Sequence, residues 1–243
     1  GTITMTGYDG VAQGVITLGG GLSTDNSSAT AVGIFGTTTL TTPNITAPFG
    51  TVALGKAGGL ESLITVGVVQ AAGTAIDTDT LKVHADVTSG SNPTTAILAN
   101  TGNKIINLGE VVVGNGVPVF DFDLFDSTGG LILTSTVDLE GGLRIETNGG
   151  LLDLSTVSVL SGGDMALEGV GITQGTTGRI DADNNTGSIV GGSILINGSG
   201  GAIALPGTIT TDNPSDTAVQ IVNGTNLEMG DVIIQFGTVN LGL

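Results

Sequence analysis

The sequence contains neither cysteine nor tryptophan, and aromatic residues make up only 3% of its 243 positions. Without cysteine, disulfide bonds and thiolate metal sites are excluded. Charged residues are also scarce, at 11%, against roughly 25% in an average soluble domain. Only five residues are Lys or Arg, and the net charge is −17. This deficit of basic side chains argues against binding to nucleic acid or to an anionic membrane surface, and it fits the solubility of an extracellular protein.

Helix-forming patterns and long apolar runs are missing as well. No window repeats apolar residues at i, i+3, i+4 and i+7 between capping residues, so we expect almost no α-helix. No apolar run approaches the ~18–20 residues of a membrane-spanning helix, so we expect no membrane span. No secretory signal is visible at Gly1, which predicts either a mature secreted form or a segment of a longer protein.

What the sequence has in abundance is glycine, at 43 residues, together with Val, Ile and Thr. Glycine pairs recur in two series. The first comprises Gly129–Gly130, Gly149–Gly150 and Gly191–Gly192, spaced by 20 and 42 residues, and the second comprises Gly141–Gly142 and Gly162–Gly163, spaced by 21. A shared period near 21 residues is typical of a solenoid or a propeller.

Within each period, the apolar residues fall in three alternating pairs. Two apolar residues separated by one other residue are typical of a short strand whose apolar side chains face inward. The sequence therefore predicts an all-β fold, a parallel β-helix (β-solenoid) with three strands per coil of about 21 residues, formed as one domain over 1–243. The predicted inward residues are, coil by coil, Leu131/Leu133, Val137/Leu139 and Leu143/Ile145; Leu152/Leu154, Val157/Val159 and Met165/Leu167; Val170/Ile172, Ile180/Ala182 and Ile189; Ile194/Ile196, Ile203/Leu205 and Ile209.

The same pattern continues upstream with less regularity. Two polar stretches, 23–30 and 211–216, are predicted to be loops that project from corners, and 71–80 is a third candidate. The upstream strand candidates are Val111/Val113, Val117–Phe120, Phe122/Leu124, Ile64/Val66/Val68 and Leu81/Val83/Ala85/Val87.

The segments 141–155, GGLRIETNGGLLDLS, and 161–167, SGGDMAL, resemble the repeat region of filamentous haemagglutinin-like exoproteins, the large adhesins exported by two-partner secretion. The resemblance rests on 129–210, about a third of the chain. It implies a right-handed parallel β-helix and a non-catalytic structural or adhesive segment of a bacterial extracellular fibre. The Asn-rich capping motif of the family's secretion domain is not recognisable, which implies a segment of the shaft.

The expected partners follow from this architecture. A solenoid leaves open strand edges and an apolar cross-section at each end. We therefore expect the chain to contact itself, by end-to-end stacking or by continuation of the same chain. Glycans or proteins on a host or neighbouring cell are the other expected partners, at an extracellular or cell-surface location.

Right-handed β-helices also include pectin lyases and polygalacturonases, so a carbohydrate-active or glycan-binding protein is the alternative function. In 120–124, FDFDL, strand alternation places Asp121 and Asp123 on one face, ~7 Å apart. With Asp126 they form the densest acidic cluster, which is compatible with a glycosidase pair or half a calcium site, although solvated outward carboxylates are commoner. The only histidine, His84, lies in an alternating strand with no nucleophile motif beside it. We therefore assign no catalytic, cofactor-binding or metal-binding residue, expect no cofactor, and predict that the chain is not an enzyme.

Two further patterns have simple interpretations. In 179–183, RIDAD, Asp181 and Asp183 are predicted to face outward, and Arg179 to neutralise a neighbouring carboxylate at the surface. Thr-x-Thr sequences such as 134–136 and 208–210 are typical of ice-binding solenoids. Their intervals are irregular here, so ice binding is a minor alternative.

Overall fold

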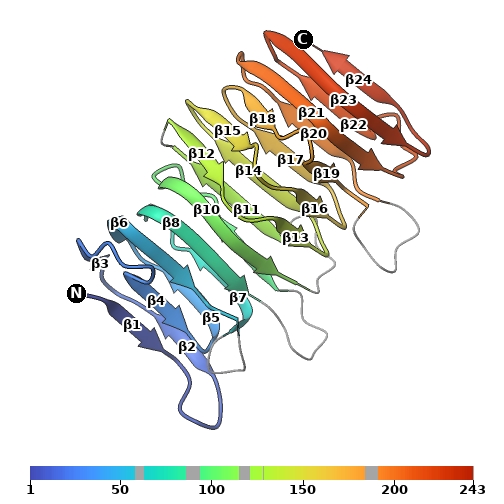
Figure 1. The fold of residues 1–243 in the computed structure, drawn as a ribbon. Helices are drawn as coiled ribbons and strands as arrows, with labels where there is room; N and C mark the ends of the chain where they lie inside the picture. The colour runs from blue at the N-terminus through green and yellow to red at the C-terminus, as the bar shows by residue number, and fades with distance from the viewer. Residues whose placement is uncertain (58–62, 86–93, 115–120, 128, 184–190, 243) are drawn as a thin grey trace.

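The computed structural model describes residues 1–57, 63–85, 94–114, 121–127, 129–183 and 191–242. Within these ranges all regular structure is β, with 24 strands and no helix. The strands are parallel and stack in about eight turns, so the fold is a β-solenoid. Figure 1 shows the strands succeeding one another from the N-terminal to the C-terminal end. The predicted all-β parallel solenoid is confirmed, whereas its right-handedness and three strands in every coil stay predictions.

The strands of the N-terminal coils are β1 (Ile3–Thr6), β2 (Gly14–Thr17), β3 (Leu22–Ser23), β4 (Val32–Phe35), β5 (Thr37–Thr42), β6 (Ile45–Leu54), β7 (Ile64–Gln70), β8 (Ile76–Ala85), β9 (Thr95–Leu98) and β10 (Lys104–Val113). Those of the following coils are β11 (Phe122–Asp126), β12 (Gly130–Leu133), β13 (Val137–Leu139), β14 (Leu143–Thr147), β15 (Leu151–Leu154), β16 (Val159–Ser161), β17 (Met165–Glu168), β18 (Ile172–Gln174), β19 (Arg179–Asp181), β20 (Ile194–Asn197), β21 (Ala202–Thr211), β22 (Val219–Val222), β23 (Asn226–Ile234) and β24 (Val239–Gly242).

In the central coils each strand pairs with the third strand after it. Leu131 of β12 lies beside Leu152 of β15, which in turn lies beside Ile172 of β18. The strands β13, β16 and β19 form a second ladder, and β14, β17 and β20 form a third. The inward residues predicted between 131 and 145 are all buried, with exposed fractions of 1% or less. The apolar alternation therefore identified this part of the core correctly.

The core is a set of apolar rows that run from coil to coil. One row stacks Ile34 on Leu54, Leu54 on Val83 and Val83 on Val111, and each of these side chains is at most 2% exposed. Successive coils lie ~4.8 Å apart, so each side chain contacts its equivalents above and below. Burial of each such side chain stabilises the fold by about 1.5–3 kcal/mol relative to exposure.

Val157 is buried as predicted, with an exposed fraction of 8%, but the inward assignment of Val170 is wrong. The strand β16 buries Val159 and Ser161, and β18 buries Ile172 and Gln174, whereas Val170 is 42% exposed. Polar side chains occupy these inward positions because they donate to corner carbonyls. Ser161 Oγ donates to the carbonyl oxygens of residues 141 and 163, and Gln174 Nε2 donates to those of residues 178 and 208. A satisfied hydrogen bond removes most of the penalty for burying a polar group.

The glycine series is also corrected by the structure. Gly192 stacks on Gly163, and Gly163 stacks on Gly142, so closely that a Cβ atom at either upper position would overlap the glycine below. The pair Gly191–Gly192 therefore continues the second series rather than the first. The reason is an unequal coil length: Met165 pairs with Ile194 rather than with a residue 21 positions later.

Upstream, the strand candidates are confirmed with two corrections. Val66 is 40% exposed because a register shift between Thr37 and Thr39 interrupts the pairing of β5 with β7. The candidate loop 71–80 ends at Ile76, where β8 begins. The loops predicted at 23–30 and 211–216 contain no strand beyond their first residue, which belongs to β3 or β21. The predictions for Val87, Val117–Phe120 and Ile189 fall outside the described residues.

Polar side chains also stack inside the solenoid. Gln70 and Asn103 join their amides in two hydrogen bonds, with Gln70 Nε2 donating at 2.6 Å and Asn103 Nδ2 donating at 3.1 Å. Asn103 Oδ1 also accepts from the backbone N–H of Ile76, and its Nδ2 donates to the carbonyl of Leu98. These side chains satisfy backbone groups where the chain turns, which is why they are buried at no large cost.

Candidate functional site

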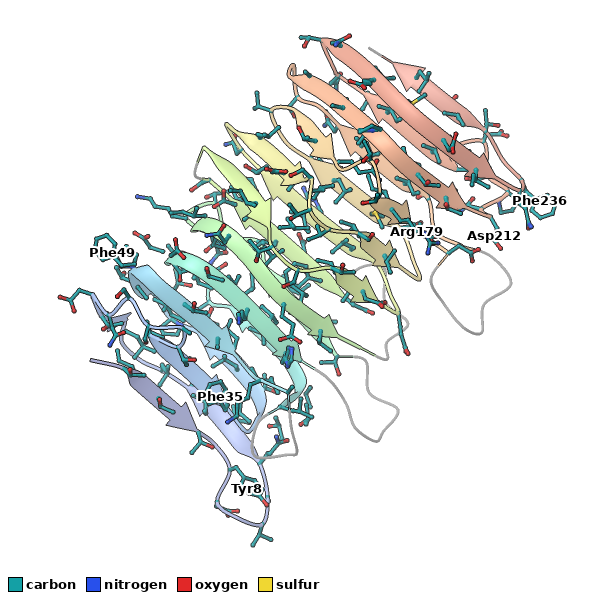
Figure 2. The ribbon with its side chains drawn as sticks, in the orientation of Figure 1. Tyr8, Phe35, Phe49, Arg179, Asp212 and Phe236 are labelled. Atoms are coloured by element: carbon teal, nitrogen blue, oxygen red, sulfur yellow. The ribbon has the colours of Figure 1, made fainter. Side chains whose placement is uncertain are left out.

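Three of the six basic residues of the chain meet at one hollow in the N-terminal coils. Lys56 follows β6, and Lys82 and His84 lie on β8. Together with Phe35 and Glu110 they line a cavity of about 160 Å³. Figure 2 places Phe35 among these N-terminal coils, away from Arg179 and Asp212 in the later ones. We refer to the cavity lined by Phe35, Lys56, Lys82, His84 and Glu110 as the basic hollow.

Small outward residues create the basic hollow. The outward positions of β4, β6 and β8 stack Gly33, Ala53 and Lys82 in register. The ring of Phe35 lies over Gly33, where any Cβ atom would overlap the ring. Because two successive coils offer only a hydrogen and a methyl group here, the surface between Phe35 and Lys82 is recessed.

A glycine turn brings Lys56 to the same place. Gly55 has a φ of +77°, a left-handed conformation that glycine adopts without steric cost. Its N–H donates to the carbonyl of Ile34 at 2.8 Å, and a Cβ atom at position 55 would overlap the carbonyl of His84. The turn places Lys56 Nζ 5.1 Å from the centroid of the Phe35 ring, within cation–π range.

A β-bulge brings Glu110 to His84. A register shift between Leu108 and Val111 takes Gly109 and Glu110 out of step with β8. The Glu110 Oε1 atom lies 3.4 Å from His84 Nε2, while most of the Glu110 carboxylate stays in solvent. The sequence predicts an outward His84, as the alternation of β8 requires, but its side chain is covered and only 5% of the residue is exposed. His84 Nε2 has no hydrogen-bond partner within the described part of the chain.

The acidic pair that the sequence singled out does not form a shared site. Asp123 lies outward, with its Oδ1 3.9 Å from Arg144 Nη1. Asp121 precedes β11 and is fully buried, so the prediction of a solvated carboxylate is wrong there. Burial, reinforced by the negative charge of Glu140, raises the pKa of Asp121 to about 6. Neither oxygen of Asp121 has a hydrogen-bond partner among the described residues. The third member of the cluster, Asp126, points inward, and its Oδ1 accepts from the backbone N–H of Ile105.

Asp123 belongs to an outward cluster around Arg144. Arg144 contacts Glu146 Oε2 at 2.5 Å and Glu168 Oε1 at 3.7 Å in addition to Asp123. Burial raises the pKa of Asp123 and of Glu146, and the Arg144 charge opposes both shifts. Arg144 therefore contacts carboxylates from three successive coils and offsets part of their negative charge. Asp123 and Arg144 are 21 positions apart, which is the length of one coil, so they pair on adjacent strands. This spacing was the signal in the sequence for their contact.

The ion pair predicted for Arg179 is confirmed, with Asp181 as its partner. Asp181 is nevertheless only 4% exposed rather than solvated, because the Arg179 guanidinium contacts it and the backbone N–H of Asp183 donates to its Oδ1. Burial, followed by the charges of Asp212 and Asp181, raises the pKa of Asp183. Asp181, Asp183 and Asp212 therefore lie close enough to influence one another electrostatically, with Arg179 as the cation paired to Asp181.

No group of three or more metal-ligating His, Asp or Glu side chains occurs among the residues that the structure describes. Nor does the described part of the chain contain a helix long and apolar enough to cross a membrane. A scan against protein-family models and searches of curated proteins and solved structures found no match to this chain.

Proposed function

We propose that the chain is a structural and adhesive segment of a bacterial extracellular fibre, similar in role to the filamentous haemagglutinin-like exoproteins that its central coils resemble. The observation that carries this proposal is the continuous parallel ladder from β1 to β24. With about eight turns, the ladder extends ~40 Å at ~4.8 Å per coil. Such a rod extends reach and repeats its outer surface along the axis.

The end coils support the proposal. Leu227, Val239 and Leu241 continue the inward rows of Ile203, Val219 and Ile221. The earlier members of these rows are buried, whereas Val239 is 37% exposed and Leu241 is 52% exposed. A second copy stacked on β24 would cover these side chains and complete the open strand edge. End-to-end association is therefore the proposed self-contact.

Glycan binding is the second candidate, and one observation favours it. The basic hollow combines an aromatic ring, cationic side chains and a partly exposed carboxylate in one recess, which is the mixture of apolar wall and few polar groups that small-ligand sites use. A recess of this kind on the side of a rod would give an adhesive segment a place to bind a ligand.

Electron microscopy and light scattering of the purified chain test the fibre proposal. We expect rods longer than the ~40 Å of a single copy, with a population that grows with concentration. Leu241→Asp should reduce this association, because it places a charge in the apolar end row. Asn240→Asp adds the same charge to an outward position of β24 and should leave association unchanged. Monodisperse single-length particles at high concentration would refute the self-contact.

A further inference from the structure

The described lining of the basic hollow carries more positive than negative charge. Within the described residues, neither Lys56 nor Lys82 has a carboxylate within ion-pair distance, and Glu110 contacts His84 instead. Among the described residues, the Lys82 ammonium group has no ion-pair partner, and that of Lys56 contacts only the Phe35 ring. In a chain of net charge −17, a recess lined by two lysines and one glutamate favours a negatively charged group.

The buried imidazole points to the same conclusion. His84 lines the cavity, is 5% exposed and leaves Nε2 without a hydrogen-bond partner in the described part of the structure. An unpartnered buried polar atom is unfavourable by about 1–3 kcal/mol. An oxygen atom of a ligand in the cavity would accept a hydrogen bond from this nitrogen and remove that penalty. The nearest carboxylate oxygen, Glu110 Oε1, lies 3.4 Å from Nε2 without forming a hydrogen bond, so a ligand oxygen in the cavity is able to satisfy this atom.

The walls and the size of the hollow restrict the ligand further. Phe35 and Ala53 present an aromatic ring and a methyl group to the cavity, and such surfaces contact the apolar face of a ring. The volume of about 160 Å³ is below the roughly 300–1,000 Å³ of sites for drug-sized ligands. The hollow therefore accommodates one ring rather than an extended chain of them. Glu110, whose side chain is 55% exposed, is available to accept from hydroxyl groups.

We propose that the basic hollow binds one anionic saccharide unit, a sugar ring that carries a carboxylate or a sulfate. The negative group lies between Lys56 and Lys82, the ring contacts Phe35, and hydroxyl groups donate to Glu110. This site rests on the adhesive part of the proposed function and gives it a ligand class. The net charge of −17 repels long polyanions, so short saccharides are the appropriate probes.

Nuclear magnetic resonance titration of the ¹⁵N-labelled full chain tests the site with three matched sugars. The probes are the methyl glycosides of galacturonic acid, galactose 6-sulfate and galactose. We expect the anionic sugars to shift the amide signals of Gly55, Lys56 and His84, and the neutral sugar to bind at least about tenfold more weakly, because it lacks the charge-assisted contact. The tighter of the two anionic sugars identifies whether the negative group is a carboxylate or a sulfate.

Two variants and a matched control locate the binding. Lys82→Gln should weaken binding of the anionic sugars about tenfold, and Phe35→Leu should weaken their binding by a smaller factor. Lys104→Gln removes the same charge from an exposed position at the start of β10 and should change the affinity less than about twofold. Thermal unfolding of each variant verifies that the solenoid is intact.

Three results would overturn the proposal. They are the absence of shifts at the hollow with both anionic sugars, an equal loss from Lys104→Gln and Lys82→Gln, and binding of inorganic sulfate as tight as that of galactose 6-sulfate. Equal affinity for inorganic sulfate would mean that the sugar ring contributes nothing to the binding free energy. These readouts are independent of rod length and association, so a failure of this site and a failure of the fibre proposal are distinguishable.

Discussion

The carboxylate of Asp121 lies against the α-carbon of Gly141, with no space for a side chain at position 141. Asp121 is fully buried, and both of its oxygens lack hydrogen-bond partners among the described residues. Burial and the charge of Glu140 raise the pKa of Asp121 to about 6 from an ordinary value of 3.8. Between these two pH values the folded protein holds a proton that the unfolded chain has lost. The contribution of Asp121 to stability therefore falls as the pH rises through this window, and the loss is complete above it.

The first prediction is that Asp121→Asn stabilises the protein at pH 7.5. Asparagine has the same shape and removes the buried charge, so we expect a gain on the order of 2–3 kcal/mol at pH 7.5 and a much smaller one at pH 4. Denaturant unfolding of the parent and the variant across this range measures the difference. Asp216→Asn removes one exposed charge and serves as the control, with a small effect that varies little with pH. Parallel stability curves for the parent and Asp121→Asn would contradict the assignment.

The burial of Asp121 marks where strand alternation stops being informative. Phe122 and Leu124 face inward and Asp123 outward, as the FDFDL pattern predicts. Asp121 precedes the first residue of β11. At a corner the side chain direction depends on the turn geometry rather than on a period of two. The alternation therefore predicts strand interiors and not the residues that begin them.

The basic hollow could not be predicted from the sequence, for a related reason. The residues that stack from Ile34 to Leu54, Val83 and Val111 are 20, 29 and 28 positions apart. No fixed period therefore aligns Phe35, Lys56 and Lys82. In the central coils, by contrast, Leu131 and Leu152 are 21 positions apart, and a regular period made those coils recognisable. Unequal coil lengths, set by corners and loops, determine which outward side chains meet.

The second prediction contrasts two adjacent residues of one coil. Leu154 ends β15, is fully buried and pairs with Gln174 of the next coil. Leu154→Asp puts a carboxylate into the apolar interior and should destabilise the protein by roughly 4 kcal/mol or more. Ser155 is exposed, and Ser155→Asp should change stability by less than about 0.5 kcal/mol. Equal losses in denaturant titration would show that the inward and outward assignment of this coil is wrong.

The third prediction concerns the stacked glycines, which distinguish two alanine substitutions that look equivalent in the sequence. Gly192 is buried, and a Cβ atom at this position would overlap the backbone of Gly163 in the coil below. Because the obstacle is backbone held in a parallel ladder, Gly192→Ala can be accommodated only by separating two coils. We expect a loss of about 3 kcal/mol or more.

Gly129 is the matched control, since nothing lies within 4 Å of its Cβ position and its φ is not in the left-handed region. Gly129→Ala should be neutral or slightly stabilising, because alanine restricts the unfolded chain. Thermal unfolding of both variants measures the difference. If Gly192→Ala were tolerated as well as Gly129→Ala, the close stacking of the two glycine-rich corners could not be correct, and the series to which Gly191–Gly192 belongs would have to be reassigned.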